Sequence, residues 1–389
     1  MNRVRLGIVG LGNMGASHCK AILDGKQPRL DVTAICDTDA ARMTSYPERV
    51  RRFADAGAMI RSGAIDAILI ATPHYSHTTI GIDALAQGLH VLVEKPISVH
   101  KADCERLIAA YERRPKAGQV FAAMFNQRTD PHYIQLKRLI ESGDLGEIRR
   151  MTWIMTDWFR TGAYYASGGW RATWGGEGGG TLLNQCPHNL DLWQWLFGMP
   201  TAVHAHCGFG QWHDIEVEDQ VNAHFTYGTR ATGTFIATTG EFPGTNRLEI
   251  AAEMGRVVVE NGCLRWQRNA VGMSEFCRTT PTVWSQPASH EVVIAVDGHG
   301  PQHAGVLANF ADAILDGAAL IAPASEGIRS VELANAMIWS GWTGQTARLP
   351  LDGAAYEARL KRAIAESRHT KAVVRASGGD FAASFGGTK

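Results

Sequence analysis

The chain has 389 residues, of which 45% are hydrophobic and 20% charged, and its 38 Lys and Arg balance its 38 Asp and Glu. This length favours two domains of ordinary globular composition. The balanced charge gives no electrostatic reason to expect nucleic acid or an anionic membrane as a partner. No apolar stretch reaches the roughly 18 residues of a membrane span. The seven cysteines are scattered without a C-x-x-C pair, and a predicted strand starts within four residues of the N-terminus. We therefore expect a soluble, cytoplasmic protein with reduced thiols.

The first forty residues predict a strand, a glycine turn, a helix and a second strand that ends in an acid. Val4–Val9 is a short apolar run, and the turn Gly10-Leu11-Gly12-Asn13-Met14-Gly15 follows it. Ala16–Leu23 has a helical pattern, and the apolar run Val32–Cys36 stops at Asp37. This order is typical of the dinucleotide-binding unit of a Rossmann fold.

Each part of this unit matches a demand of dinucleotide binding. Gly10 can adopt a positive φ in a tight turn, Gly12 leaves the backbone open to a pyrophosphate, and Gly15 lets the helix pack closely on the strand. The free N–H groups at the helix start favour the phosphate charge. Asp37 can accept hydrogen bonds from the ribose hydroxyls and repels the 2′-phosphate of NADP, although Arg42 could offset part of this repulsion. We therefore predict NAD rather than NADP as the cofactor.

The alternation of strands and helices continues to about residue 124. The expected elements are a helix over Ala40–Arg52, a strand over Ile65–Ile70, a helix capped by Ser76 and ending at Gln87, a strand over His90–Val93, a helix over Val99–Arg113 and a strand over Val120–Met124. Such alternation predicts a parallel, doubly wound sheet. Ligands of such sheets lie outside the carboxyl ends of the strands. We therefore expect Thr72, Pro73 and Lys95, which follow predicted strands, to share one rim with the glycine turn.

The pattern changes after about Asn126. Helices are expected over Pro131–Ser142, Asn184–Phe197, Ala304–Leu315, Ser325–Trp342 and Tyr356–Glu366. A strand is expected over Glu147–Thr156, and Val203 to about Val296 reads as several strands of a large, mostly antiparallel open sheet. The fold class is therefore α/β: a Rossmann dinucleotide-binding domain over residues 1–126, and an α+β domain over 127–389 for substrate binding and oligomerisation, with a cleft between them. We expect one face of the second sheet to be uncovered and too apolar for water, which predicts a homodimer or homotetramer.

Four ordered motifs resemble the glucose–fructose oxidoreductase / inositol dehydrogenase / rhizopine-catabolism (Gfo/Idh/MocA) family of NAD(P)-dependent oxidoreductases. They are the glycine turn, the Ala71–His77 turn, Glu94-Lys95-Pro96, and the run Gly178–Asn184 followed by His188 and Asp191. Their order and spacing cover most of the chain. The resemblance implies the cofactor-binding residues Gly10, Gly12, Asn13, Met14, Asp37, Thr72, Pro73, His77, Glu94 and Lys95.

The resemblance also implies that Lys95 and His188 are catalytic, in a dehydrogenase that oxidises a secondary hydroxyl of a pyranose sugar, a sugar derivative or a cyclitol. An ammonium at Lys95 can hydrogen-bond the reacting hydroxyl, and a neutral imidazole at His188 can accept its proton. The family usually has an aspartate where this chain has Asn184. Asn184 can orient His188 or bind a hydroxyl from the same helix face, but it supplies no negative charge. We expect proton abstraction to rely more on Lys95 than in a typical relative, and the division of work between Lys95 and His188 stays open.

A glycine-rich segment from Trp158 to Gly180 carries several aromatic residues. Sugar C–H faces pack on aromatic rings, and sugar hydroxyls need placed polar groups. The expected substrate-binding residues are Asn184, Asp191, Arg171, Trp170 and Tyr164. No metal is expected, because histidines two apart on a strand, such as His204 and His206, occur often by chance.

Two alternatives to the dehydrogenase stay open. One is an enzyme that modifies a glycoside by oxidising and then re-reducing it with the same NAD. The other is a regulator that binds NAD without catalysis. Retention of Lys95 and His188 argues against a regulator, whereas Asn184 slightly favours it.

Overall fold

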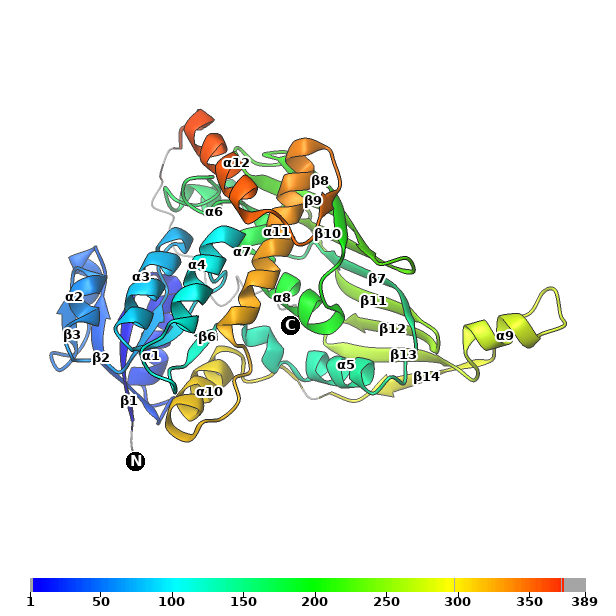
Figure 1. The fold of residues 1–389 in the computed structure, drawn as a ribbon, viewed down its shortest axis with the longest axis horizontal. Helices are drawn as coiled ribbons and strands as arrows, with labels where there is room; N and C mark the ends of the chain where they lie inside the picture. Colours follow the sequence, from blue (N-terminus) through cyan, green and yellow to red (C-terminus); the bar gives the residue numbers. More distant parts are fainter. Residues whose placement is uncertain (1–2, 297, 372, 374–389) are drawn as a thin grey trace.

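The computed structural model describes residues 3–296, 298–371 and 373. Two sheets lie side by side, with helices packed around the first and along one face of the second (Figure 1). The first sheet has six strands and the second has nine. None of the helices in this part of the chain is long and apolar enough to cross a membrane.

The first sheet is parallel, in the order β3-β2-β1-β4-β5-β6. Its strands are β1 Val4–Val9, β2 Leu30–Cys36, β3 Arg51–Phe53, β4 Ala67–Ile70, β5 His90–Val93 and β6 Phe121–Ala123. The intervening α-helices are α1 Asn13–Leu23, α2 Ala56–Ile60, α3 His74–Ala86 and α4 Lys101–Glu112. The strand order reverses between β1 and β4, so the ligand crevice of such a sheet lies beyond their carboxyl ends. This confirms the predicted doubly wound Rossmann sheet.

Two local predictions in this half are wrong. The helix expected over Ala40–Arg52 is replaced by a 3-10 turn, Ala40–Met43, and by edge strand β3. Pro47 explains the difference, because a proline inside the stretch removes a helix hydrogen bond and disfavours helix at the residue before it. The second error concerns Ser76, because α3 begins at His74, directly after Pro73.

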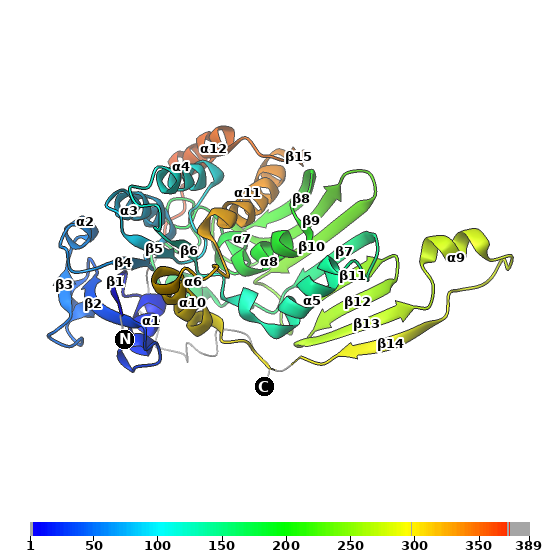
Figure 2. The same cartoon turned by 60° about the horizontal axis from the view of Figure 1, so that its bottom comes forward.

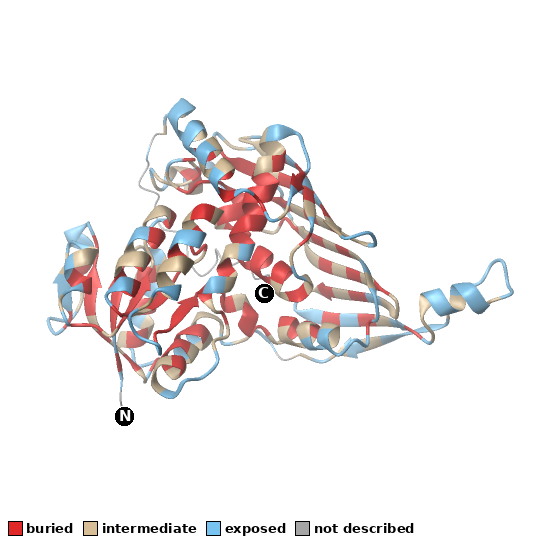
Figure 3. Cartoon of the chain, in the orientation of Figure 1, coloured by how far each residue is buried: buried red, intermediate tan, exposed pale blue. Residues whose placement is uncertain are grey.

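The second sheet runs β14-β13-β12-β11-β7-β10-β9-β8-β15 and is antiparallel except where β7 pairs with β10. Its strands are β7 Ile148–Met155, β8 Ala202–Phe209, β9 Glu218–Tyr227, β10 Ala231–Thr238, β11 Asn246–Ala252, β12 Gly255–Glu260, β13 Cys263–Asn269, β14 Ser289–Ile294 and β15 Ala347–Arg348. Figure 2 shows helices α5 (Pro131–Glu141), α8 (Pro187–Phe197) and α11 (Gly327–Thr343) along one face of this sheet. The buried residues form a continuous layer between these helices and the strands (Figure 3). This confirms the predicted large, mostly antiparallel sheet.

The helix predicted from Asn184 to Phe197 is two helices. The short α7, Thr181–Asn184, ends before α8 begins at Pro187. A proline is well placed at the first position of a helix, because its missing N–H would have no partner there in any case.

The other face of the second sheet is mostly polar, so the prediction of an apolar uncovered face is wrong. Arg150 pairs with Glu249 at 2.5 Å, and Arg247 pairs with Glu260 at 3.0 Å. Other polar side chains that are exposed or half-buried on this face are Thr152, His204, His206, Asn222, His224, Thr232, Thr234, Arg256 and Arg265, and the apolar Ile154, Ile236, Val258 and Val293 are scattered among them. Burial of apolar surface therefore no longer supports the predicted dimer or tetramer.

The C-terminal helices return to the first sheet. In α10, Gln302–Asp316, the side chains of Leu307 and Phe310 share a hydrophobic cluster with Leu6 and Val32 of β1 and β2. Residues 302–316 therefore pack with the N-terminal sheet, although they follow the second sheet in sequence.

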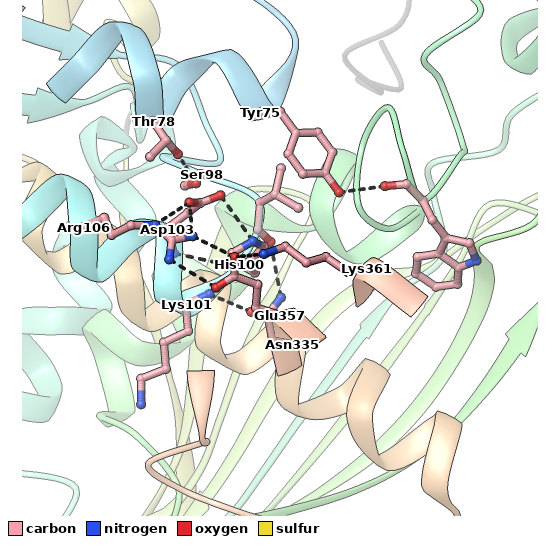
Figure 4. A network of polar contacts seen from close by, with 12 residues as sticks. Tyr75, Thr78, Ser98, His100, Lys101, Asp103, Arg106, Asn335, Glu357 and Lys361 are labelled. Carbon is pink, nitrogen blue, oxygen red and sulfur yellow. Dashed lines mark hydrogen bonds and ion pairs between the residues drawn. The ribbon is translucent and has the colours of Figure 1, made fainter. Parts of the chain in front are cut away.

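A polar network joins α4 to α11 and to α12, Gly353–Glu366 (Figure 4). Lys101 Nζ donates to the Leu351 carbonyl at 2.6 Å and pairs with Glu332 at 3.0 Å. Arg106 pairs with Glu357 at 3.1 Å. These contacts fix the second half of the chain on the first.

Candidate active site

The glycine turn after β1 needs glycine for two separate reasons. Gly10 has φ +86°, and a Cβ there would lie 2.6 Å from the carbonyl oxygen of Ala71. A Cβ on Gly15 would lie 1.8 Å from the carbonyl oxygen of Gly10. At Gly12, by contrast, the nearest atom to an added Cβ is Arg42 Nη1 at 3.7 Å. The turn is therefore closely packed at Gly10 and Gly15. It has open space at Gly12, where a pyrophosphate would approach the backbone.

The groups around this turn fit a dinucleotide. The N-terminus of α1, which begins with Asn13 and Met14, has no side-chain cap, so its N–H groups can receive a phosphate. At the end of β2 the Asp37 carboxylate accepts the N–H of Leu11 at 2.7 Å, which fixes it beside the turn. After β4, Thr72 Oγ1 is buried and has no hydrogen-bond partner among the described residues. Backbone donors, an acid and an unsatisfied hydroxyl thus line one rim, as the sequence predicts.

His77 and Glu94, both predicted to bind the cofactor, have protein partners in the structure. The His77 ring nitrogens lie 2.8 Å from the carbonyl oxygen of Pro96 and 2.9 Å from that of Thr72. His77 therefore ties the turn after β4 to the turn after β5, and we place it in the scaffold of the cofactor site.

Glu94 lies 2.7 Å from His18 Nε2, a histidine of α1 that sequence reasoning missed. Burial would raise the pKa of Glu94, but His18, His303 and Lys95 together lower it to about 2. The carboxylate therefore stays ionised next to Lys95. His303 belongs to α10, far away in sequence, and its ring centroid is 5.5 Å from that of His18.

Lys95 and His188, from the two halves of the chain, come together. Lys95 follows β5, and its Nζ donates to the backbone carbonyl of Asn184, the last residue of α7, at 2.8 Å. His188 lies in the first turn of α8, so the expectation that Asn184 and His188 share one helix face is wrong. Burial lowers the pKa of Lys95, against the raising effect of Glu94 and Glu177. Burial also lowers the pKa of His188 well below its usual value, and the charge of Lys95 adds to this shift. His188 Nδ1 is buried without a partner in the described part of the chain.

Asn184 lies in a buried network whose acid, Glu177, sequence reasoning missed. The Glu177 carboxylate accepts the side-chain N–H of Asn184 and the backbone N–H of Ala172. Asn184 Oδ1 accepts from the Tyr164 hydroxyl at 3.1 Å, and that hydroxyl accepts from Arg171 at 3.0 Å. Burial raises the pKa of Glu177, while the Ala172 N–H and Arg171 lower it. The structure thus joins three predicted substrate residues to an acid directly before the motif Gly178–Asn184.

The fourth predicted substrate residue, Trp170, borders the same network. The Arg171 guanidinium lies 4.6 Å from the Trp170 ring centroid and 4.7 Å from that of Tyr164. The ring of His74, in the first turn of α3, is 6.0 Å from that of Trp170. Aromatic faces from the glycine-rich segment therefore lie beside the first half of the chain.

Asp191, the fifth predicted substrate residue, has a different position. It is 1% exposed, and both carboxylate oxygens accept from Arg128 at 2.7 Å. Gln194 donates to one of them at 3.1 Å. Because these contacts engage the carboxylate inside the protein, we leave Asp191 out of the proposed substrate site.

A second buried acid holds the start of α7. Glu218 Oε1 accepts the N–H groups of Gly180 at 2.9 Å and of Leu182 at 3.0 Å. Burial raises the pKa of Glu218 to about 7, despite these two hydrogen bonds. In the described ranges, no group of three or more His, Cys, Asp or Glu could hold a metal ion.

Both halves match models of one protein family. The model described as an oxidoreductase family with an NAD-binding Rossmann fold matches residues 4–122, and that of the GFO/IDH/MocA C-terminal domain matches residues 133–258. The rhizopine catabolism protein MocA of Rhizobium meliloti is 31% identical over 199 residues, which are 51% of this chain and 58% of that protein. Inositol 2-dehydrogenase 1 of Saccharopolyspora erythraea is 32% identical over 148 residues, 37% of this chain and 43% of that protein. The chain thus spans about half the length of these curated relatives.

A solved structure extends the likeness to nearly the whole chain. The WlbA dehydrogenase from Bordetella pertussis, in complex with NADH and UDP-GlcNAcA, superposes with a TM-score of 0.74 and 25% identity, covering 90% of this chain and 100% of that chain. The chain therefore belongs to the Gfo/Idh/MocA oxidoreductase family, and its first domain is an NAD-binding Rossmann domain.

Proposed function

We propose that the protein is an NAD-dependent dehydrogenase that oxidises a secondary hydroxyl of a pyranose sugar, a sugar derivative or a cyclitol. The observation that carries this proposal is the meeting of Lys95 and His188 at the junction of the two halves. Lys95 Nζ contacts the carbonyl of Asn184 at the end of α7, and His188, in the first turn of α8, has an Nδ1 without a partner among the described residues.

The two side chains divide the proton chemistry. Burial keeps the pKa of His188 low, so its imidazole is neutral at physiological pH and can accept the hydroxyl proton. Lys95 donates a hydrogen bond to the same oxygen and stabilises the negative charge that develops on it. Bound NAD would supply the acceptor for the hydride that leaves the carbinol carbon. This division gives the base to His188 and makes Lys95 the electrostatic partner, which reverses the expectation from the sequence that proton abstraction relies more on Lys95.

The surroundings support a polyhydroxylated substrate. Trp170 and Tyr164 offer aromatic faces, while Arg171 and Asn184 offer polar groups, a combination suited to a sugar ring. Among the relatives, one is named an inositol 2-dehydrogenase, and the WlbA dehydrogenase was solved with a sugar nucleotide.

The test is NAD reduction on a panel of monosaccharides, anhydrosugars, glycosides, sugar nucleotides and inositols. We expect one class to be oxidised, with NAD preferred over NADP. Lys95→Met and His188→Ala should each lower kcat by about 10²–10⁴-fold, with NAD affinity unchanged. Lys137→Met is the matched control, because Lys137 also donates to a backbone carbonyl, that of Trp195 at 2.7 Å, but away from the site.

Three outcomes would contradict this proposal. Unchanged turnover in both variants would remove the assigned roles. Tightly held NAD with substrate conversion but no net reduction would indicate transient oxidation of a glycoside. NAD binding without any turnover would favour a regulator, the function to which the neutral Asn184 points.

A further inference from the structure

The Lys95 ammonium interacts by charge with two buried carboxylates, one from each half of the chain. Glu94 is its neighbour in sequence, whereas Glu177 reaches it from the glycine-rich segment of the second half. Both carboxylates act on Lys95 by charge. Among the described residues, the other charged or titratable groups that interact with Lys95 include Arg160, Arg171, His74, His77, Cys186, His188 and His303.

Glu177 is 2% exposed, and both of its carboxylate oxygens accept hydrogen bonds. One oxygen accepts the backbone N–H of Ala172 at 2.5 Å, and the other accepts the side-chain N–H of Asn184. The backbone carbonyl of Asn184 holds Lys95 Nζ at 2.8 Å. A continuous link therefore runs from the Glu177 carboxylate through Asn184 to the Lys95 ammonium.

We propose that Glu177 is a positioning residue of the active site: through Asn184 it fixes the carbonyl that orients Lys95, and it supplies the negative charge that position 184 lacks. This inference rests on the proposed function for its effect on turnover. The coupling between Glu177 and Lys95 does not depend on the proposed function, because it follows from the positions of the two side chains.

The ionised form of Glu177 is the one that this network favours. Both of its oxygens face N–H donors, and a carboxylate is an acceptor only. The positive charges of Arg171 and Lys371 also favour the carboxylate. A nearby opposite charge stabilises an ammonium, so removal of the Glu177 charge should lower the pKa of Lys95 further.

Glu177→Gln tests this coupling with little change of shape. A flipped Asn184 amide can still hydrogen-bond the glutamine, but it turns its NH2 toward Tyr164 and Gln185, which donate to Asn184 Oδ1 in the unmodified protein, so the double variant below is needed to isolate the loss of charge. The direct readout is the pH dependence of the rate at which an acylating reagent labels Lys95, followed by peptide mass spectrometry. We expect the midpoint for Lys95 to fall by about one pH unit. Glu216→Gln is the matched control. Glu216 accepts the N–H of Trp174, a residue of the glycine-rich segment, at 2.8 Å, but it does not contact Asn184.

A charge exchange separates the proposed role from a merely structural one. In the double variant Glu177→Gln/Asn184→Asp the carboxylate moves one hydrogen bond closer to Lys95, and the labelling midpoint should return to or above that of the unmodified protein. Asn184→Asp alone brings two carboxylates into contact, where they share a proton and carry about one charge, so its midpoint should stay near that of the unmodified protein. The double variant keeps the test decisive even if Glu177→Gln does not fold.

Turnover gives a second readout. The limb of the kcat/KM pH profile that disappears in Lys95→Met should move to lower pH in Glu177→Gln, with kcat/KM reduced about tenfold at its optimum and largely recovered in the double variant. An unchanged labelling midpoint in Glu177→Gln would overturn the inference, and so would a midpoint about one pH unit below that of the unmodified protein in the double variant. A protein with the expected midpoints but no sugar oxidation would retain the inference about Glu177 and lose the proposed function.

Discussion

The two rims of the candidate site are built in different ways. On the cofactor side, one local segment forms the rim through its backbone. Gly10, Gly12 and Gly15 shape the turn, and the N–H groups at the uncapped start of α1 can receive a phosphate. On the substrate side, buried side chains from separate segments hold one another, as in the link from Glu177 through Asn184 to Lys95. The comparison teaches that the first rim depends on shape and the second on charge.

The largest effect is expected at the buried ion pair of Arg128 and Asp191, which tests how far the substrate side depends on charge. Arg128→Met leaves the Asp191 carboxylate buried with only Gln194 as a donor, and we expect a loss of roughly 3–5 kcal/mol in the free energy of unfolding. Denaturant unfolding measures the loss. The double variant Arg128→Met/Asp191→Leu should recover most of it, because the one carboxylate left without Arg128, that of Glu326, is partly exposed to water. If Asp191→Asn instead raises KM at little cost in stability, Asp191 binds substrate and our reassignment of it is wrong.

Glu218 provides a pH test of the charged rim. Because burial raises its pKa to about 7, the folded protein holds a proton that the unfolded chain releases above its ordinary pKa near 4.5. The folded state therefore loses stability as pH rises from about 5 to 8. Relative to Glu218→Gln, the loss should be on the order of 3 kcal/mol, measured by urea unfolding at several pH values. Glu216→Gln should follow the unmodified protein, and parallel curves for all three proteins would refute the expectation.

Gly10→Ala tests the shape-dependent rim. The substitution combines an unfavourable positive φ with a contact of 2.6 Å to the Ala71 carbonyl, so we expect roughly 1–3 kcal/mol of destabilisation and weaker NAD binding by calorimetry. Gly25→Ala is the control for backbone strain alone, since Gly25 has φ +80° and open space around its Cβ position. Equal effects in the two variants would mean that close approach to Ala71 is unimportant.

The smallest expected effect concerns cofactor choice at Asp37. In Asp37→Asn the amide oxygen can still accept the N–H of Leu11, the N–H of Asp39 loses its acceptor, and the charge that repels a 2′-phosphate is gone. The preference for NAD over NADP should fall about tenfold, measured as the ratio of the two dissociation constants. Arg42→Ala should sharpen the preference instead, because Arg42 lies beside Gly12. A preference unchanged in both variants would show that neither charge selects the cofactor.

Local sequence signals predict the cofactor half well because each role lies within a few residues. Five of the six strands, the glycine turn and the acid Asp37 could be placed from the sequence. The one serious local error, a helix over Ala40–Arg52, came from giving too little weight to Pro47.

The substrate half was predicted less completely because its roles depend on contacts between distant segments. Lys95 and His188 were expected to meet, but the partner of Asn184 is Glu177, and Asp191 is held by Arg128, 63 residues away in sequence. Nothing in the spacing of these residues indicates such pairings. An isolated acid directly before Gly178–Gly180 was the one available signal, and only its burial shows what it does.

The return of α10 to the first sheet limits how this protein can be divided. Leu307 and Phe310 shield Leu6 and Val32, so a fragment cut after residue 126 would leave the apolar side of its own sheet bare to water. The nucleotide module is thus completed by a segment made only after the substrate half. A chimera that takes its substrate half from a relative must therefore keep α10 from the protein that supplies the nucleotide-binding half.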